Sequence, residues 1–178
     1  MDNCLSCGLA KNKKIIGGKI FFPHWIANTY LGDEGMSGHL VLYTKIHRDD
    51  FSNLKLEELE DLGPNIGILQ RLLRQYWEKT FPGDEIERIY ICYFHEGIFG
   101  NKEEEYLNNT HTHIHLIPRP KSIGKLLREY SKDNSIHAHS IYKIKENKNF
   151  PDRYLKTNER VIKMMNFLKN SNYEIRER

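Results

Sequence analysis

The stretch Thr110-His111-Thr112-His113-Ile114-His115-Leu116-Ile117-Pro118-Arg119 contains three histidines at alternate positions. Because successive side chains of a β-strand point to opposite faces, this spacing predicts a strand with all three imidazoles on one face. Ile114 and Leu116 then point to the other face, toward the core. Mere exposure does not require imidazole, since Lys, Thr or Glu would serve as well. We therefore interpret the histidine face as a functional site.

Two kinds of chemistry suit such a face. Neighbouring side chains on one strand face lie roughly 6.5–7 Å apart. At that spacing one imidazole can attack a phosphorus while another contacts the leaving group or the non-bridging oxygens, because neutral imidazole is a nucleophile and a proton carrier near pH 7. The alternative is metal ligation by two of the three histidines, with a third ligand elsewhere and an open position for water.

The order of the predicted elements indicates an α+β protein with a mainly antiparallel sheet, because strands come first, then one long crossing helix, then strands again. Apolar residues recur every three or four positions from Leu59 to Tyr76, which predicts one buried helix face, and Pro64 should kink or split this helix. Strands are expected at residues 19–22, 25–30, 38–44, 87–94 and 110–117, and helices at 56–80, 123–130 and 158–170. The last helix carries an apolar stripe that should pack on the rest of the protein, formed by Val161, Met164, Met165 and Leu168.

Composition narrows the class of protein. The 178 residues are 39% hydrophobic and 29% charged, which excludes a disordered chain, and the longest apolar runs are too short to cross a bilayer, so we expect no membrane partner. The net charge of +3 divides unevenly: residues 1–142 carry 17 basic and 19 acidic side chains, and residues 143–178 carry 10 and 5. A nucleic-acid partner is therefore not excluded, because the tail is basic. Three cysteines and no signal-peptide pattern predict reduced thiols in a cytoplasmic protein.

Several motifs, in order, resemble the histidine triad (HIT) superfamily. Residues 111–115 match its His-x-His-x-His signature and are followed by Pro118-Arg119. Gly38-His-Leu-Val-Leu-Tyr-Thr-Lys-Ile-His47 is similar to the family's Gly-His strand and the turn after it. Cys4-Leu-Ser-Cys7 stands where many bacterial, zinc-containing members carry Cys-x-x-Cys. The likeness to this family, which includes diadenosine polyphosphate hydrolases, runs from Cys4 to Arg119, about two thirds of the chain.

The resemblance implies roles for the triad. His113, the middle histidine, would attack the α-phosphate of a nucleotide to form a nucleotidyl-histidine intermediate, and His115 would assist at the phosphate oxygens or the leaving group. The family's polar stretch before the triad is replaced here by Tyr106-Leu-Asn-Asn-Thr110, which suggests an altered site or donors from two asparagines. The residues expected to bind substrate are Asn108, Asn109, His95 and Arg119; the last of these either binds phosphate or pairs with acidic residues.

The resemblance also implies a cofactor and a partner. A structural zinc ion with no position left for water would be held by Cys4, Cys7, His47 and His111. Members commonly pair through a two-fold interface that joins their sheets, so a homodimer is expected. We expect a HIT-like catalytic domain over residues 1–130 and a basic C-terminal extension over 131–178 with one amphipathic helix.

The leading functional hypothesis is a nucleotide phosphohydrolase or nucleotidyl transferase. It would cleave a nucleotide anhydride or phosphoramidate, with dinucleoside polyphosphates among the candidate substrates, through a covalent intermediate on His113. One alternative is a nucleotide-binding regulatory module with little turnover. The other is a metal-dependent hydrolase that uses the triad histidines as ligands of a catalytic metal.

Overall fold

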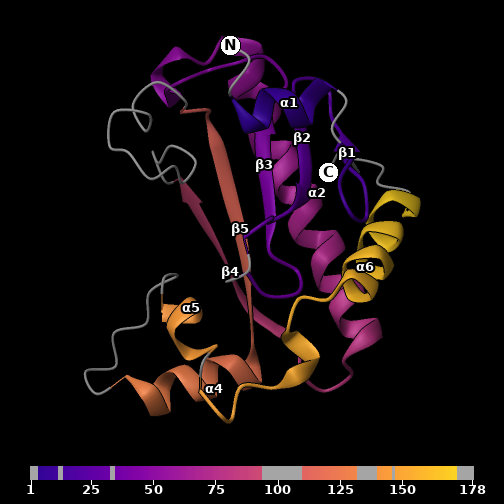
Figure 1. Ribbon diagram of the computed structural model, residues 1–178, viewed down its shortest axis with the longest axis vertical. Helices are drawn as coiled ribbons and strands as arrows, with labels where there is room; N and C mark the ends of the chain where they lie inside the picture. Colours follow the sequence, from indigo (N-terminus) through magenta and orange to yellow (C-terminus); the bar gives the residue numbers. More distant parts are fainter. Residues whose placement is uncertain are drawn as a thin grey trace.

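A computed structural model describes residues 4–11, 14–32, 35–93, 110–131, 140–145 and 147–171. Its centre is a five-stranded sheet in which all neighbours are antiparallel, with the order β1-β2-β3-β5-β4 (Figure 1). The strands are β1 (Ile20–Phe21), β2 (Trp25–Thr29), β3 (Leu40–Thr44), β4 (Ile86–Tyr93) and β5 (His113–Pro120). This arrangement confirms the predicted α+β class. The histidine strand β5 lies inside the sheet, between β3 and β4, so its backbone is held on both sides.

One face of the sheet is covered by the long helix α2 (Leu56–Thr80). The buried residues of α2 include Leu69, Leu73 and Trp77, which share one core with the β3 residues Leu40 and Leu42. The predicted stripe was one position off at its start: Leu59 is 40% exposed, and Glu58 is buried instead.

A kink or a split was expected at Pro64, and the split does not occur, because α2 is uninterrupted over 25 residues. Proline lacks the N–H that would bond to the carbonyl of Glu60, four residues earlier. Pro64 and Glu60 both lie on the exposed side of the helix, where water can solvate that carbonyl.

The opposite face of the sheet carries a smaller apolar cluster. It joins Leu9 of α1 (Leu5–Lys11) to Ile26 of β2 and Tyr43 of β3. Helix α1 therefore lies over the face that carries His113 and His115, since the register pairs Tyr43 with His113.

The C-terminal segment belongs to the main core. It contains α4 (Lys121–Tyr130), α5 (Ser140–Ile144), the 3₁₀ turn η2 (Asp152–Tyr154) and α6 (Asn158–Asn170); another 3₁₀ turn, η1 (Phe51–Asn53), precedes α2. The predicted stripe on α6 is buried at all four positions and packs beside α2 (Figure 1). A bridge between Met36 and Leu155 ties this segment to the turn before β3. Among the described residues, no helix is both long and apolar enough to span a membrane.

Candidate functional site

The first histidine of the triad lies just before β5, and the other two lie on it. His113 pairs with Tyr43 and His115 with Val41, so both imidazoles share the face covered by α1. Ile114 and Leu116 point to the α2 face and are buried, as the alternation predicts. The N–H of Thr112 donates to the carbonyl of Arg48 at 2.6 Å, which holds the loop after β3 against the start of β5.

Four side chains that could hold a metal ion converge at the start of β5. They are Cys4, Cys7, His47 and His111, and their ligand atoms all lie within 4.8 Å of one another. Nδ1 of His111 lies 3.3 Å from Sγ of Cys4 and 3.6 Å from Sγ of Cys7, and Nδ1 of His47 lies 3.3 Å from Sγ of Cys7. Tetrahedral zinc, with Zn–S of about 2.3 Å and Zn–N of about 2.0–2.1 Å, requires S···N separations of about 3.5 Å. The spacing of the donors fits such an ion.

The orientation of His111 fits metal ligation as well. Its Nε2 lies 2.9 Å from the carbonyl of Thr44, so this nitrogen carries the proton and donates it to the carbonyl. The lone pair is then on Nδ1, which faces the two thiols, the arrangement that metal-bound histidines commonly show. Burial lowers the pKa of His111 to about 4, so its ring is neutral at pH 7. Burial, followed by the neighbouring Cys4, raises the pKa of the Cys7 thiol to about 11; a bound divalent cation would reverse that, because a coordinating thiol loses its proton.

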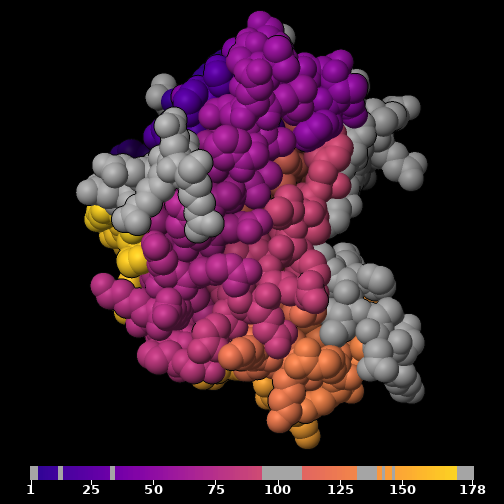
Figure 2. Space-filling model, turned by 180° about the vertical axis from the view of Figure 1, so that it is seen from behind, coloured from indigo at the N-terminus to yellow at the C-terminus, as the bar shows by residue number. Residues whose placement is uncertain are grey.

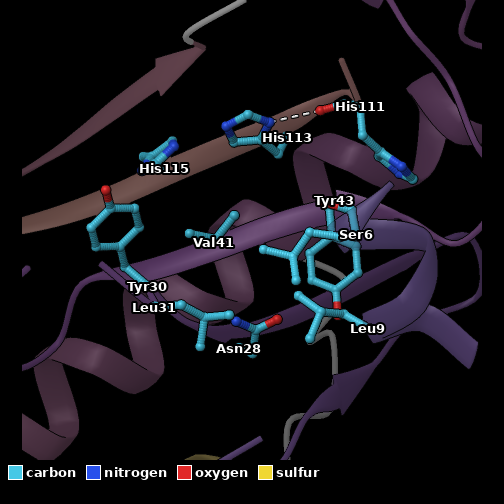
Figure 3. A pocket seen from close by; sticks show the side chains of 11 residues that line it. Ser6, Leu9, Asn28, Tyr30, Leu31, Val41, Tyr43, His111, His113 and His115 are labelled. Carbon is cyan, nitrogen blue, oxygen red and sulfur yellow. Dashed lines mark hydrogen bonds between the residues drawn. The ribbon is translucent and has the colours of Figure 1, made fainter. Parts of the chain in front are cut away.

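His113 is held in the opposite tautomer. Its Nδ1 lies 2.7 Å from the backbone carbonyl of His111 and donates to it (Figure 3). The proton on Nδ1 makes Nε2 the nitrogen with the lone pair. A neutral imidazole of fixed orientation meets the requirement for a nucleophile.

His115 is buried beside a second histidine. Its Nδ1 lies 2.8 Å from Nε2 of His39, and the ring of His39 stacks on Tyr30 with centroids 4.3 Å apart. Burial, and then the charges of His115 and Lys156, lower the pKa of His39 well below its ordinary value, so His39 is neutral. The His113 and His115 rings have centroids 5.0 Å apart. The two imidazoles are therefore close enough to act on adjacent atoms of one ligand.

A cavity of about 110 Å³ opens beside these rings, between the sheet and α1. All three triad histidines line it, together with apolar side chains of α1, β3 and the end of β2, including Leu9, Leu31 and Val41 (Figure 3). Apolar walls with a few convergent polar groups are typical of small-molecule sites.

Arg119 is not among the residues that line this cavity. Its guanidinium donates to the hydroxyl of Tyr90 at 2.8 Å and lies 3.3 Å from the carboxylate of Glu87. The structure therefore does not bring Arg119 to the site. Three other residues predicted to bind substrate, His95, Asn108 and Asn109, lie outside the described residues.

Three residues that line the cavity were not predicted from the sequence: Asn28, Tyr30 and Tyr43. The sequence does contain a signal for Asn28, because this polar residue directly follows the apolar run Trp25-Ile26-Ala27 in an expected strand. Buried polar groups in a strand need partners, which marks them for closer inspection. No comparable pattern marked the tyrosines.

The chain has the fold of the histidine triad (HIT) proteins, as its motifs predicted. Among solved structures it is similar to a HIT-like protein involved in cell-cycle regulation from Bartonella henselae, with a TM-score of 0.56 over 95% of this chain and 96% of that chain, at 12% identity. It is also similar to a HIT family member from Bacillus subtilis, with a TM-score of 0.51 over 78% and 85% of the two chains, at 17% identity. No protein-family model and no curated protein matches the chain.

Proposed function

We propose that the protein is a nucleotide phosphohydrolase or nucleotidyl transferase that cleaves a nucleotide anhydride or phosphoramidate. The observation that carries the proposal is the bond from Nδ1 of His113 to the carbonyl of His111 at 2.7 Å, beside a cavity of about 110 Å³. It makes Nε2 of His113 a nucleophile with fixed orientation. The HIT-like motifs of the sequence point to the same chemistry.

The reaction has two displacements at the α-phosphorus. Nε2 of His113 forms a bond to phosphorus, and the bond to the leaving group breaks with its electron pair; an amine leaving group also takes a proton from water. His115, positioned by His39, contacts a non-bridging oxygen or the leaving atom. Water then attacks the phosphorus and gives up one proton to the solvent, the bond to Nε2 breaks, and the lone pair returns to His113 with release of a nucleoside monophosphate. A different acceptor in place of water makes the same protein a transferase.

The four-residue cluster fits a structural zinc ion. Four ligands are available, from Cys4, Cys7, His47 and His111. A tetrahedral ion bound by all four has no position left for a reacting water, which argues against a metal-dependent hydrolase. When bound, the ion would supply a cross-link between the start of α1 and the start of β5. Both segments contribute to the lining of the cavity, through Leu5 and Ser6 of α1 and through His113 of β5.

The test is substitution of the proposed nucleophile. His113→Ala should lower turnover of nucleoside phosphoramidates and dinucleoside polyphosphates at least about 10³-fold, since it removes the atom that forms the intermediate. Wild-type protein quenched with alkali should carry one nucleotidyl group by mass spectrometry, and the variant none. His24→Ala, a histidine in the β1–β2 turn, is the control and should behave as wild type.

Two results would change the assignment. Full turnover by His113→Ala across the substrate panel would eliminate the covalent mechanism. Tight nucleotide binding by wild type with no turnover would identify the protein as a regulatory module that keeps the site without the reaction.

We also propose that the protein is a homodimer joined at β4. This strand is the last in the sheet order and contacts α2. It is exposed on the face of the molecule that Figure 2 shows. Ile91 is 48% exposed and Tyr93 is 37% exposed there. Pairing of two β4 strands would cover both and satisfy the edge. Light scattering in solution tests this assembly.

A further inference from the structure

Two buried polar side chains, Asn28 and Tyr43, line the cavity on β2 and β3 (Figure 3). The register places Tyr43 opposite His113 and places Asn28 one strand further away. Asn28 pairs with Val41 across β2 and β3, and Tyr43 lies two residues further along β3. The two are therefore diagonal neighbours on the same sheet face, within reach of one ligand group. Asn28 lies two strands from His113, which is about 10 Å across the sheet.

Each of these side chains has a polar atom without a partner among the described residues. Nδ2 of Asn28 donates to the carbonyl of Thr29 at 2.6 Å, which fixes the orientation of the carboxamide and leaves Oδ1 unpaired. The hydroxyl of Tyr43 also has no partner. Asn28 is 2% exposed and Tyr43 is 1% exposed. Buried polar groups are nearly always satisfied in proteins, so two unpaired atoms in one cavity indicate that a ligand satisfies them.

The donor and acceptor inventory limits the chemistry of that ligand. Oδ1 of Asn28 can only accept, so the ligand must present an N–H or O–H donor. The phenolic hydroxyl of Tyr43 carries its proton near pH 7 and can donate to an acceptor beside that donor. The walls between the two are apolar, with Leu9, Val41 and Leu31. The cavity of about 110 Å³ is smaller than cavities of about 150 Å³ that bind benzene, but it is open on one side, so it admits the six-membered ring of a base edge first.

Asn28 lies on β2, two strands from His113, so a nucleotide with its α-phosphorus at His113 brings its base, not its ribose, to Asn28. We propose that Asn28 and Tyr43 read the edge of the nucleobase: Oδ1 of Asn28 accepts from an exocyclic amino group, and the hydroxyl of Tyr43 donates to the adjacent ring nitrogen. Adenine and cytosine have this pair of groups. This inference rests on the proposed function, because the phosphate site orients the ligand.

The experiment compares adenosine 5′-phosphoramidate with the same compound of purine riboside, which lacks the amino group. Wild type should prefer adenosine by about 10- to 100-fold in kcat/KM, the range expected for one buried hydrogen-bond partner left unpaired. Asn28→Leu and Tyr43→Phe should each lower kcat/KM for adenosine about 10-fold or more. Asn28→Leu should leave purine riboside within about twofold of wild type, so the preference disappears.

The controls separate base recognition from other causes. Tyr43→Phe keeps the ring that packs on Leu9, so it tests the hydroxyl alone if Asn28→Leu fails to fold. Tyr30→Phe removes a different hydroxyl of the cavity wall and should leave the adenosine-to-purine-riboside ratio unchanged. The 2′-deoxyadenosine compound tests the ribose as the group that is read.

The outcomes are distinct. Equal kcat/KM for adenosine and purine riboside in wild type overturns the inference, and so does a loss that follows the 2′-hydroxyl instead of the amino group. If wild type turns over neither compound, the proposed reaction fails, and calorimetric binding of AMP against purine riboside monophosphate then tests the base reading by itself. A preference for AMP that Tyr43→Phe removes supports it, and equal binding overturns it.

Discussion

Two histidines at the start of β5 lie in opposite settings. The Nδ1 side of His111 faces Cys4, Cys7 and His47, whereas His113, two residues later, has only the cavity beside its ring. A backbone carbonyl accounts for the difference in each case. The carbonyl of Thr44 accepts a hydrogen bond from the N–H at Nε2 of His111, so Nδ1 faces the thiols. The carbonyl of His111 accepts a hydrogen bond from the N–H at Nδ1 of His113, so Nε2 is the nucleophilic atom.

One residue, His111, links the metal-ligand cluster to the proposed nucleophile His113. His111 contributes its ring to the cluster and its carbonyl to His113. A metal ion that fixes the ring therefore also fixes the acceptor that sets the tautomer of His113. The following predictions test whether the cluster positions the strand without taking part in the chemistry.

The largest expected effect is on stability, from loss of the cluster. Cys7→Ser should abolish the one equivalent of zinc and lower the free energy of unfolding by about 3 kcal/mol or more, which corresponds to about 10 °C in Tm for a chain of this size. The measurements are metal analysis and calorimetry. Cys92→Ser is the matched control, since Cys92 lies on β4 outside the cluster and its substitution should leave the zinc content unchanged.

Chelation distinguishes a structural metal from a catalytic metal in this cluster. Removal of the metal from wild type should lower Tm to that of Cys7→Ser, while turnover measured well below the new Tm persists. Immediate loss of turnover with no change in Tm would contradict a structural role and identify a catalytic metal.

The sequence predicted the alternating strand, the metal cluster and the long helix, because each depends on a local residue pattern or on contiguous sequence motifs. Ile114 and Leu116 alternate with histidine, and that alone determines which face is buried. The tautomers could not be predicted, because they depend on carbonyls that the fold brings into contact, such as that of Thr44, 67 residues from His111. The role of Tyr43 in the cavity likewise depends on the register between β3 and β5. The continuity of α2 through Pro64 depends on which side of the helix is solvated.

A smaller effect on stability is expected from pH, through His39 beside the cavity. His39 is buried and neutral, with its pKa well below the ordinary value of about 6.5 that it has when unfolded. The unfolded state therefore binds the extra proton first, so stability should be complete above about pH 6.5 and fall as the pH drops below it. Each unit by which the pKa is lowered corresponds to about 1.4 kcal/mol.

The variant His39→Gln isolates this contribution. Glutamine keeps a hydrogen-bonding group toward His115 but does not titrate, so the decrease in Tm between pH 7 and pH 5 should be smaller than in wild type. His24→Gln, in the β1–β2 turn with a side chain 40% exposed, should change that decrease little. An unchanged pH dependence in His39→Gln would show that the acid sensitivity comes from other groups.

The smallest expected effect concerns the rim of the cavity. Nζ of Lys156 donates to the carbonyls of Tyr30, Leu31 and Gly32 and lies 5.9 Å from the centre of the Tyr30 ring, so the C-terminal segment holds the chain that forms this rim. Lys156→Met keeps the apolar stem and removes the donors; KM should rise about three- to tenfold, with kcat within about twofold, because loosening the rim weakens ground-state binding. Lys163→Met, an exposed lysine of α6, should leave both constants unchanged. A fall in kcat at constant KM would instead mean that the charge of Lys156 acts on His39 and His115, so the C-terminal segment would influence the chemistry and not only the binding.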